Sequence, residues 1–242
     1  MSKPSKSDWE RVARITDKIQ GYLLHTEGKL LYRLAKGCPG GVAIVEIGSW
    51  KGRSTVWLYF GSASGNRATI YAVDPHTGSP ELKKRHGESS SLQEFKDNIK
   101  RIKAFDLVVP LVEKSEEAVQ EFNQKVGLVF IDGDHSYRAV KKDFKLWFPK
   151  IINKGFILFH DTIGFQSVNK AVREMAFKSK KIKNIKIIDS IVWGQKCQKL
   201  SAIDRLKNRY VLFLHDLCVF FFRSKLPYFL INFGKSILKR IH

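Results

Sequence analysis

The sequence predicts an α/β protein built on a doubly wound, mostly parallel sheet of seven strands. Five short apolar runs alternate with stretches of helical periodicity between residues 42 and 177. Such alternation produces parallel strands with helices on both faces of the sheet. Two further apolar runs, at 185–188 and 190–193, are nearly adjacent, so we expect an antiparallel pair at one edge.

Helices are predicted before the sheet begins, over residues 1–41. Apolar residues recur at spacings of three and four from Trp9 to Leu23, and leucines do so again between 27 and 36. Gly21 interrupts the first helix, and a cluster of glycine and proline at 37–41 ends the second. The sheet domain is then expected over 42–195 and a separate C-terminal extension over 196–242.

The first strand, 42–47, leads into a glycine turn and the N-terminal end of a helix. Further strands are expected at 69–73, 107–112, 127–131 and 155–159, with residues 149–154 as a connection and a helix over 168–177. A long polar insertion at 77–91 lies where a lid or a substrate loop is expected.

Bulk properties restrict the class of protein. The 242 residues are 43% hydrophobic, which is enough for one domain with a sizeable core. Three widely spaced cysteines predict neither a disulfide framework nor a zinc site, and they favour a reducing, cytoplasmic compartment. We expect neither a secretory signal at the N-terminus nor a transmembrane segment, because the longest late apolar run is interrupted by His215 and Asp216.

The formal net charge is +20. Such an excess indicates an anionic partner, either acidic lipid, a phosphorylated substrate or nucleic acid, or else a surface of solvated lysines. No nucleic-acid motif is present, and the aromatic residues do not alternate with basic ones in a stacking pattern. No nucleic-acid partner is therefore expected.

Polar residues collect where the strands end. These are Glu46, Asp74, Asp132, Asp134, His160 and Asp161. Ligands of open α/β sheets bind at this edge. Each residue has an ordinary alternative, such as a helix cap, a turn or a buried structural histidine, but the set favours a site.

The turn Gly48–Gly52 lacks the Gly-Lys-Ser/Thr of a P-loop and the third glycine of a dinucleotide fingerprint. An acid at the end of the second strand, Asp74, suits the two hydroxyls of a ribose. Together these features predict an adenosine cofactor without a pyrophosphate.

Several ordered motifs carry a family resemblance across residues 20–193. They are Gly21–Leu24 with Glu27-Gly28 and Leu31–Ala35, Glu46–Thr55, Ala72–His76, Phe130–Tyr137 and His160–Thr162. The chain resembles class I S-adenosylmethionine-dependent methyltransferases, and within them methyltransferase family 24. That branch is related to the sugar O-methyltransferases of macrolide and aminocoumarin pathways and to cephalosporin hydroxylase-like proteins. The resemblance implies a Rossmann-like methyltransferase fold.

The resemblance also implies roles for individual residues. Glu46, Gly48 and Ser49, with Ser54 nearby, would hold the methionine part of S-adenosylmethionine. Asp74 would take the ribose hydroxyls, Ser115 lies where the family contacts adenine, and Asp132 belongs to the cofactor and catalytic positions. Asp132 and Asp161 lie where metal-dependent relatives bind Mg²⁺, with His160 in place of a carboxylate. Because imidazole is a poorer Mg²⁺ ligand than a carboxylate, this departure leaves the metal open.

Methyl transfer to a hydroxyl needs positioning and a group that removes the proton. Asp134 and His135 are both candidates for that base, since His135 has a suitable intrinsic pKa and relatives favour the aspartate. The resemblance implies O-methylation of a hydroxyl on a sugar or glycan, either free or lipid-linked. The alternatives are a Mg²⁺-dependent enzyme acting on a phenol or other small molecule, and a non-catalytic, membrane-associated relative in polysaccharide assembly.

The C-terminal extension, 196–242, lies outside the resemblance. It carries ten basic and two acidic residues around an apolar, aromatic segment. One interpretation is an interfacial helix on anionic lipid at the inner face of the membrane. The other is a helical pair packed on the domain or on a second copy of the chain in a homodimer.

Overall fold

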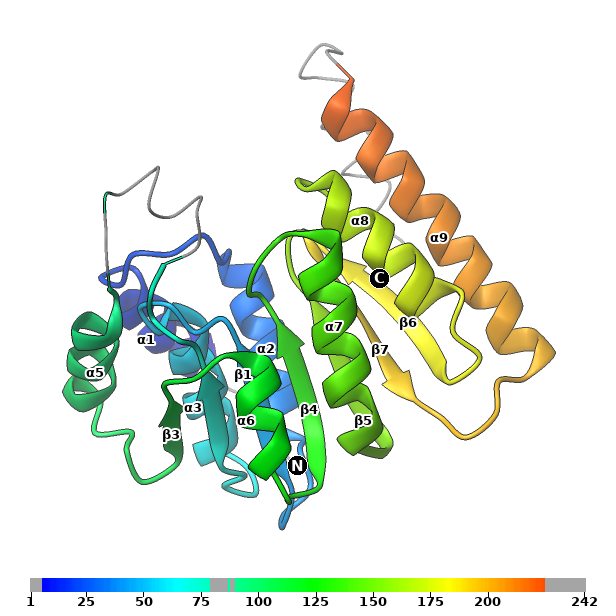
Figure 1. Cartoon of the computed structure of the whole chain (residues 1–242). Coiled ribbons are helices and arrows are strands. Elements are labelled where there is room, and N and C mark those ends of the chain that lie inside the picture. Colours follow the sequence, from blue (N-terminus) through cyan, green and yellow to red (C-terminus); the bar gives the residue numbers. More distant parts are fainter. Residues whose placement is uncertain (1–5, 79–86, 88–89, 225–242) are drawn as a thin grey trace.

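The computed structural model describes residues 6–78, 87 and 90–224 (Figure 1). Its centre is a seven-stranded sheet in the order β3-β2-β1-β4-β5-β7-β6. The strands are β1 Ala43–Ile47, β2 Ile70–Val73, β3 Val108–Leu111, β4 Val126–Ile131, β5 Ile151–Phe159, β6 Ile182–Ile188 and β7 Ile191–Lys196. The first five strands run parallel, and β7 lies antiparallel between β5 and β6. The predicted fold class and the antiparallel edge pair are confirmed.

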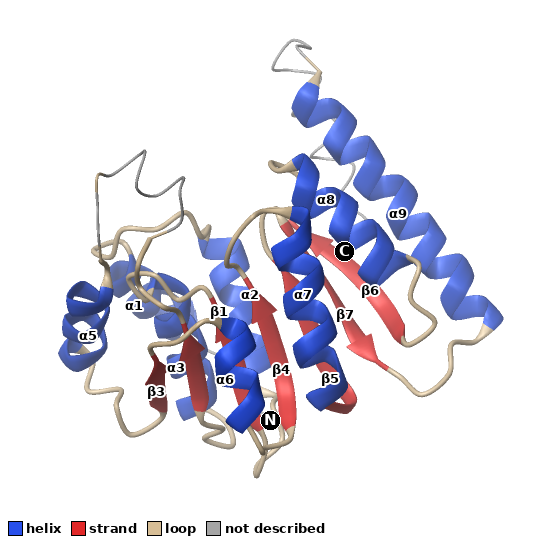
Figure 2. Cartoon of the chain, viewed as in Figure 1, coloured by secondary structure: helices blue, strands red, loops and turns tan. Residues whose placement is uncertain are grey.

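Helices cover both faces of the sheet (Figures 1 and 2). One layer contains α1 Lys6–Thr16, α2 His25–Lys36, α3 Arg53–Ala63 and α5 Leu92–Arg101. The other contains α6 Ser115–Glu121, α7 Tyr137–Trp147, the short η1 Phe148–Lys150, and α8 Gln166–Val172 with its π-helical extension η2 Arg173–Phe177. The two layers form separate apolar cores, which meet only through the sheet.

The central strand β1 is buried along its whole length, because it lies between β2 and β4 and is covered by helices on both faces. Its side chains alternate, with Val45 and Ile47 in one core and Ile44 in the other. Alternation therefore directs Glu46 into the layer that holds α3. The strand order reverses between β1 and β4, which is the position where open α/β sheets bind ligands.

Several element boundaries differ from the sequence prediction. Residues 149–154, predicted as a connection, include the start of β5, since Ile151 is buried and pairs with Val126 before the register shifts. Lys154 then takes a positive φ of 69°, so the kink that resembled a loop lies inside the strand. The helix predicted over 168–177 changes from α-helical to π-helical geometry at Arg173.

The N-terminal helix is shorter than its periodicity predicts. α1 ends at Thr16, whose hydroxyl donates to the carbonyls of Val12 and Ala13 at 3.1 and 3.0 Å. Ile19 and Leu23 continue the apolar pattern as buried residues of a non-helical segment, 17–24. This segment brings Gln20 and Tyr22 to the carboxyl edge of the sheet.

The described part of the C-terminal extension is a single long helix, α9 Ala202–Arg223, which packs beside β6 and η2. The buried Asn208 amide donates to the carbonyl of Ile182 at 2.9 Å and accepts from the amide of Ile185 at 3.4 Å. Within the described ranges, no helix is both long and apolar enough to cross a bilayer. Residues 225–242, which carry the rest of the predicted extension, lie outside the described residues.

Candidate active site

A cavity of about 520 Å³ opens at the carboxyl ends of the parallel strands. Its walls come from the turn after β1, the ends of β2, β4 and β5, the start of α6 and the segment 17–24. All of the strand-end residues predicted from the sequence line this cavity, with the exception of Glu46. The cavity is large enough for a nucleoside-sized ligand together with a second molecule.

The glycine turn brings the backbone of β1 directly against the loop after β4. Gly48 has a φ of +88°, and a side chain there would overlap the carbonyl oxygen of Asp132. Gly52, also at +88°, precedes α3 and provides no side-chain cap for its first amides. Uncapped amides at the start of a helix form a favourable environment for a ligand's carboxylate.

Glu46 lies beneath this turn and is fully buried. The Thr55 hydroxyl donates to its Oε2 at 2.5 Å, while its Oε1 has no hydrogen-bond partner among the described residues. Burial raises the pKa of Glu46 to about 7, although the hydroxyls of Ser54 and Thr55 oppose the shift. The second oxygen is thus available for a donor that a ligand would supply.

Asp74 is held rigidly on the cavity wall. Its two carboxylate oxygens accept from the backbone amides of Trp50 at 2.8 Å and His76 at 2.7 Å. Each oxygen keeps a second lone pair. The strand-two acid is therefore oriented before any ligand arrives.

Three serines predicted at the cofactor positions also lie on the wall. The Ser49 hydroxyl is buried without a partner among the described residues. Ser54 is buried in the first turn of α3. Ser115 begins α6 and accepts a hydrogen bond from the Trp147 indole at 2.9 Å.

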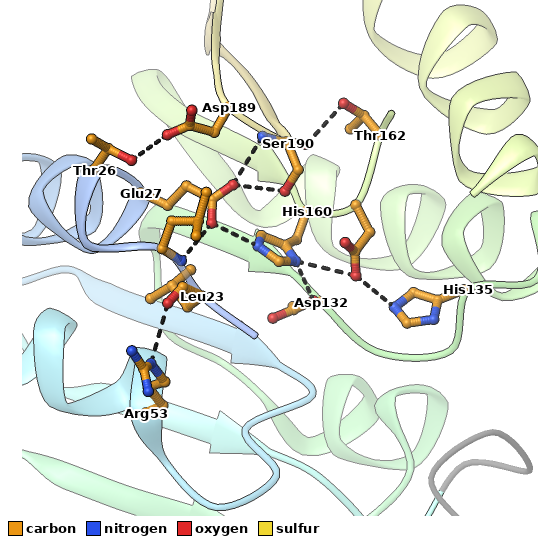
Figure 3. Close-up of polar contacts among 12 residues, drawn as sticks. Leu23, Thr26, Glu27, Arg53, Asp132, His135, His160, Thr162, Asp189 and Ser190 are labelled. Carbon is orange, nitrogen blue, oxygen red and sulfur yellow. Dashed lines mark hydrogen bonds and ion pairs between the residues drawn. The ribbon is translucent and has the colours of Figure 1, made fainter. Parts of the chain in front are cut away.

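A chain of alternating acids and histidines crosses the floor of the cavity (Figure 3). His160 Nε2 lies 3.2 Å from Glu27 Oε2, and its Nδ1 lies 3.1 Å from Asp132 Oδ1 and 3.3 Å from Asp161 Oδ2. The same Asp161 oxygen is 3.1 Å from His135 Nε2. The His135 ring stacks on Phe165, with 4.0 Å between centroids.

Comparison with protein families finds one similar domain. Residues 45–162 match the family model described as a methyltransferase domain. The middle of the chain is thus similar to methyltransferase domains. The match covers the glycine turn and, on the floor, Asp132, His135, His160 and Asp161, but not Glu27.

The chain is also similar to individual sequences and solved structures. An uncharacterised protein of Sinorhizobium fredii is 31% identical over 120 residues, which are 49% of this chain and only 13% of that protein. An O-methyltransferase of Bacillus cereus, solved with SAH, superposes with a TM-score of 0.57 at 17% identity, over 80% of this chain and 92% of that one.

The O-methyltransferase TomG of Streptomyces achromogenes, solved with SAM and involved in tomaymycin synthesis, gives a TM-score of 0.56 at 14% identity, over 81% and 92% of the two chains. At these identities the two structures establish the methyltransferase fold.

Charged side chains on the floor of the cavity shift one another's pKa values. Burial acts to lower the pKa of His160, but Asp132, Asp161 and Glu27 outweigh it and raise that pKa well above its usual range. Burial acts to raise the pKa of Glu27 and of Asp161, but contacts with His160, and with His135 for Asp161, lower both. The three carboxylates around His160 therefore favour its charged form.

One group of side chains in the domain fits a divalent cation. Ligand atoms of Asp132, His135 and Asp161 all lie within 4.8 Å of one another. The sequence predicted His160 as the third ligand, whereas both ring nitrogens of His160 face carboxylates. Asp132, His135 and Asp161 would offer a metal two carboxylates and one imidazole, a mixed donor set rather than the all-oxygen set that Mg²⁺ prefers.

Glu27 and Ser190 were not predicted as site residues. The Ser190 hydroxyl and amide donate to Glu27 Oε1 at 2.7 and 2.9 Å, while Oε2 faces His160. The sequence does contain a sign that Glu27 is buried. It precedes the inward-facing Leu30 and Leu31 by three and four residues, so it lies on the same face of the helix. An acid at an inward position of an amphipathic helix requires a buried partner.

The segment 17–24 contributes an aromatic pair that sequence reasoning also missed. The Tyr22 and Trp50 rings stack nearly parallel, with centroids 6.1 Å apart and an interplanar angle of 5°. Both residues line the cavity, and Tyr22 is 57% exposed. Lys51 lies beside them, with its ammonium 5.2 Å from the Trp50 ring.

Proposed function

We propose that this protein is an S-adenosylmethionine-dependent O-methyltransferase that methylates a hydroxyl of a sugar or glycan. The main support for this proposal is the arrangement of residues around the cavity. A rigid cofactor cradle, made by the glycine turn and Asp74, faces an acid–histidine floor that can remove a proton. The acceptor would enter between them.

The residues of the cradle fit S-adenosylmethionine. Asp74 would accept from the ribose hydroxyls, and Ser115, also on the cavity wall, would contact the adenine. Ser49, Ser54 and the α3 amides would hold the methionine carboxylate, with Glu46 behind the turn. When bound, the cofactor supplies an electrophilic methyl group. The Bacillus cereus and Streptomyces achromogenes proteins, which hold SAH and SAM, support this assignment.

The aromatic pair at the cavity favours a sugar as the acceptor. The Tyr22 and Trp50 rings offer a flat apolar surface for the C–H face of a sugar ring, and Gln20 and Lys51 offer polar groups beside it. Gln20 and Lys51 are joined by a 2.8 Å hydrogen bond. A sugar presents both kinds of surface, and a lipid-linked sugar would fit the same opening.

His135 is the base that the geometry favours. With Nε2–H directed at Asp161, Nδ1 is the nitrogen that accepts the proton. When the cofactor's methyl group passes to the acceptor oxygen, His135 would take up the proton that the hydroxyl loses. One oxygen of the exposed Asp134 accepts from the amide of Ser136 at 2.6 Å, which makes Asp134 the second choice.

A divalent cation is the alternative way to activate the acceptor. The observation in its favour is the ligand group of Asp132, His135 and Asp161. A metal there would lower the pKa of a bound hydroxyl, and Asp134 would take the proton. This arrangement goes with a phenolic or other small-molecule acceptor. Activity lost in a chelator and restored by Mg²⁺ or Mn²⁺ would identify it.

Transfer of labelled methyl from S-adenosylmethionine to glycan and phenol extracts tests the proposal. With a sugar acceptor, His135→Gln should lower kcat by about 10²- to 10⁴-fold while cofactor affinity stays unchanged. His25→Gln is the matched control, because His25 also pairs with an aspartate, Asp17, but lies away from the cavity. If no glycan is methylated, the proposed acceptor is refuted. If phenols are not methylated either, the result favours a non-catalytic role.

A further inference from the structure

The surface of α9 opposite the domain carries a stripe of exposed apolar residues. Asn208 and His215 lie on the inner face of the helix, and both are buried. On the opposite side, large residues follow one another at alternating spacings of three and four: Ile203, Leu206, Tyr210, Phe213, Leu217 and Phe220. All but Leu217 are 51–70% exposed.

This pattern differs from ordinary scattered exposure. Single exposed apolar residues need no explanation, but a continuous stripe along a helix marks a surface that is covered in the working protein. The helix has 22 residues and is therefore about 33 Å long. The stripe begins at its second residue and reaches its last turn.

Cations flank the stripe, and the carboxylates of α9 are engaged within the protein. Arg205, Lys207, Arg209 and Arg223 are all exposed. Asp204 caps the helix by pairing with Ser201, and Asp216 forms an ion pair with Arg173 of η2. The outer surface of α9 is thus apolar along its middle and positive at its sides.

We propose that α9 docks on an anionic lipid surface, with the stripe embedded at the interface and the flanking cations at the headgroups. Bulky aromatic residues between Lys and Arg are the pattern of helices that lie in a membrane plane. The charge decides against a second copy of the chain as the occupant. Two copies would bring the same cations together, whereas acidic lipid complements both α9 and the net charge of +20.

Docking through α9 also orients the methyltransferase domain. In Figures 1 and 2 the C-terminal end of α9 projects past the sheet on the side where the parallel strands end. The cavity opens at those strand ends. His215 Nε2 further lies 3.2 Å from the hydroxyl of Thr162, the residue after Asp161. A docked helix would therefore be fixed to the loop that carries the acceptor side of the cavity.

Vesicle sedimentation with the full chain tests the proposal. The vesicles are phosphatidylcholine alone and phosphatidylcholine mixed equally with phosphatidylglycerol. The protein should bind only the anionic vesicles, and high salt should weaken binding. Lys207→Glu combined with Arg209→Glu should weaken vesicle binding at least about tenfold. Each Lys or Arg near an acidic surface adds to the affinity, and this variant loses two of them. Leu206→Ser with Phe213→Ser should weaken it about tenfold or more.

Matched controls distinguish binding through α9 from nonspecific electrostatic or hydrophobic binding. Lys100→Glu with Arg101→Glu reverses one lysine and one arginine on the exposed side of α5, and Phe105→Ser removes an aromatic residue that is 48% exposed. Both controls should bind close to wild type. Circular dichroism and titration with S-adenosylmethionine would verify that every variant stays folded.

Three outcomes would overturn the proposal. One is no binding of the wild type to anionic vesicles. Another is binding that the α9 variants do not change. The third is a concentration-dependent dimer in sedimentation velocity that the same variants abolish, without vesicle binding, since a second copy would then cover the stripe. None of these depends on whether the protein transfers methyl groups.

Discussion

At the scale of single residues, the site depends on buried charges that hold one another in place. Glu27, His160, Asp132, Asp161 and His135 form one connected series, in which each histidine lies between carboxylates or beside one. Removing one member would leave another charge buried and unpaired, which costs several kcal/mol. Glu46 is different, because its neighbours are hydroxyls and its pKa is raised by burial.

Glu46 should make the stability of the protein depend on pH. Its pKa rises from an ordinary 4.5 to about 7 on folding, so the native state binds more protons than the unfolded chain between these values. The contribution of Glu46 to the free energy of unfolding is fully present below pH 4.5 and is lost as the pH rises through 7. The loss amounts to about 3 kcal/mol at most.

Thermal unfolding of Glu46→Gln against wild type measures this effect. The variant should gain stability relative to wild type between about pH 5 and about pH 8. Exposed Glu113→Gln should keep the wild-type profile. A constant difference between Glu46→Gln and wild type across that range would contradict the shift.

At the scale of elements, the packing of α3 on α2 holds the glycine turn in position. Gly61 of α3 meets the backbone of Tyr32, and Gly28 of α2 meets the Trp57 ring, so closely that a side chain at either position would overlap its neighbour. The glycines let the two helices approach. Because α3 starts at the turn, this contact sets where its N-terminal amides point.

Gly61→Ala should lower the free energy of unfolding by about 1–3 kcal/mol. Alanine favours helices, but the overlap is with a backbone carbonyl that cannot move aside, so the clash exceeds the gain in propensity. Urea unfolding measures the difference. Gly164→Ala, where the structure has open space, is the control and should be neutral. Equal stabilities for wild type and Gly61→Ala would show that the helices can separate without cost.

Most elements could be predicted because each has a strong local signal. The five parallel strands and the edge pair follow from apolar runs bounded by turns. The start of β5 was missed because Lys154 interrupts the strand with a local kink, which in sequence resembles a loop. The end of α1 was missed because Ile19 and Leu23 stay buried after the helix has stopped.

At the scale of the whole molecule, the cavity could be predicted in outline and not in detail. Strand-end residues such as Asp74 and Asp132 could be anticipated, because parallel strands deliver their carboxyl ends to one edge. Glu27 could not be connected with His160, since the two are 133 positions apart and meet only through packing of α2 on the sheet. The stacking of Tyr22 on Trp50 could not be predicted either, because it also depends on tertiary packing.

Cofactor binding tests the central claim most directly. Isothermal titration of the full chain with S-adenosylmethionine should show binding, and Asp74→Ala should weaken it at least about tenfold, because a buried hydrogen-bonded contact to the ribose is lost. Asp97→Ala, an exposed aspartate on α5, should bind as wild type does. A folded wild type that does not bind, or Asp74→Ala indistinguishable from wild type, would contradict the account.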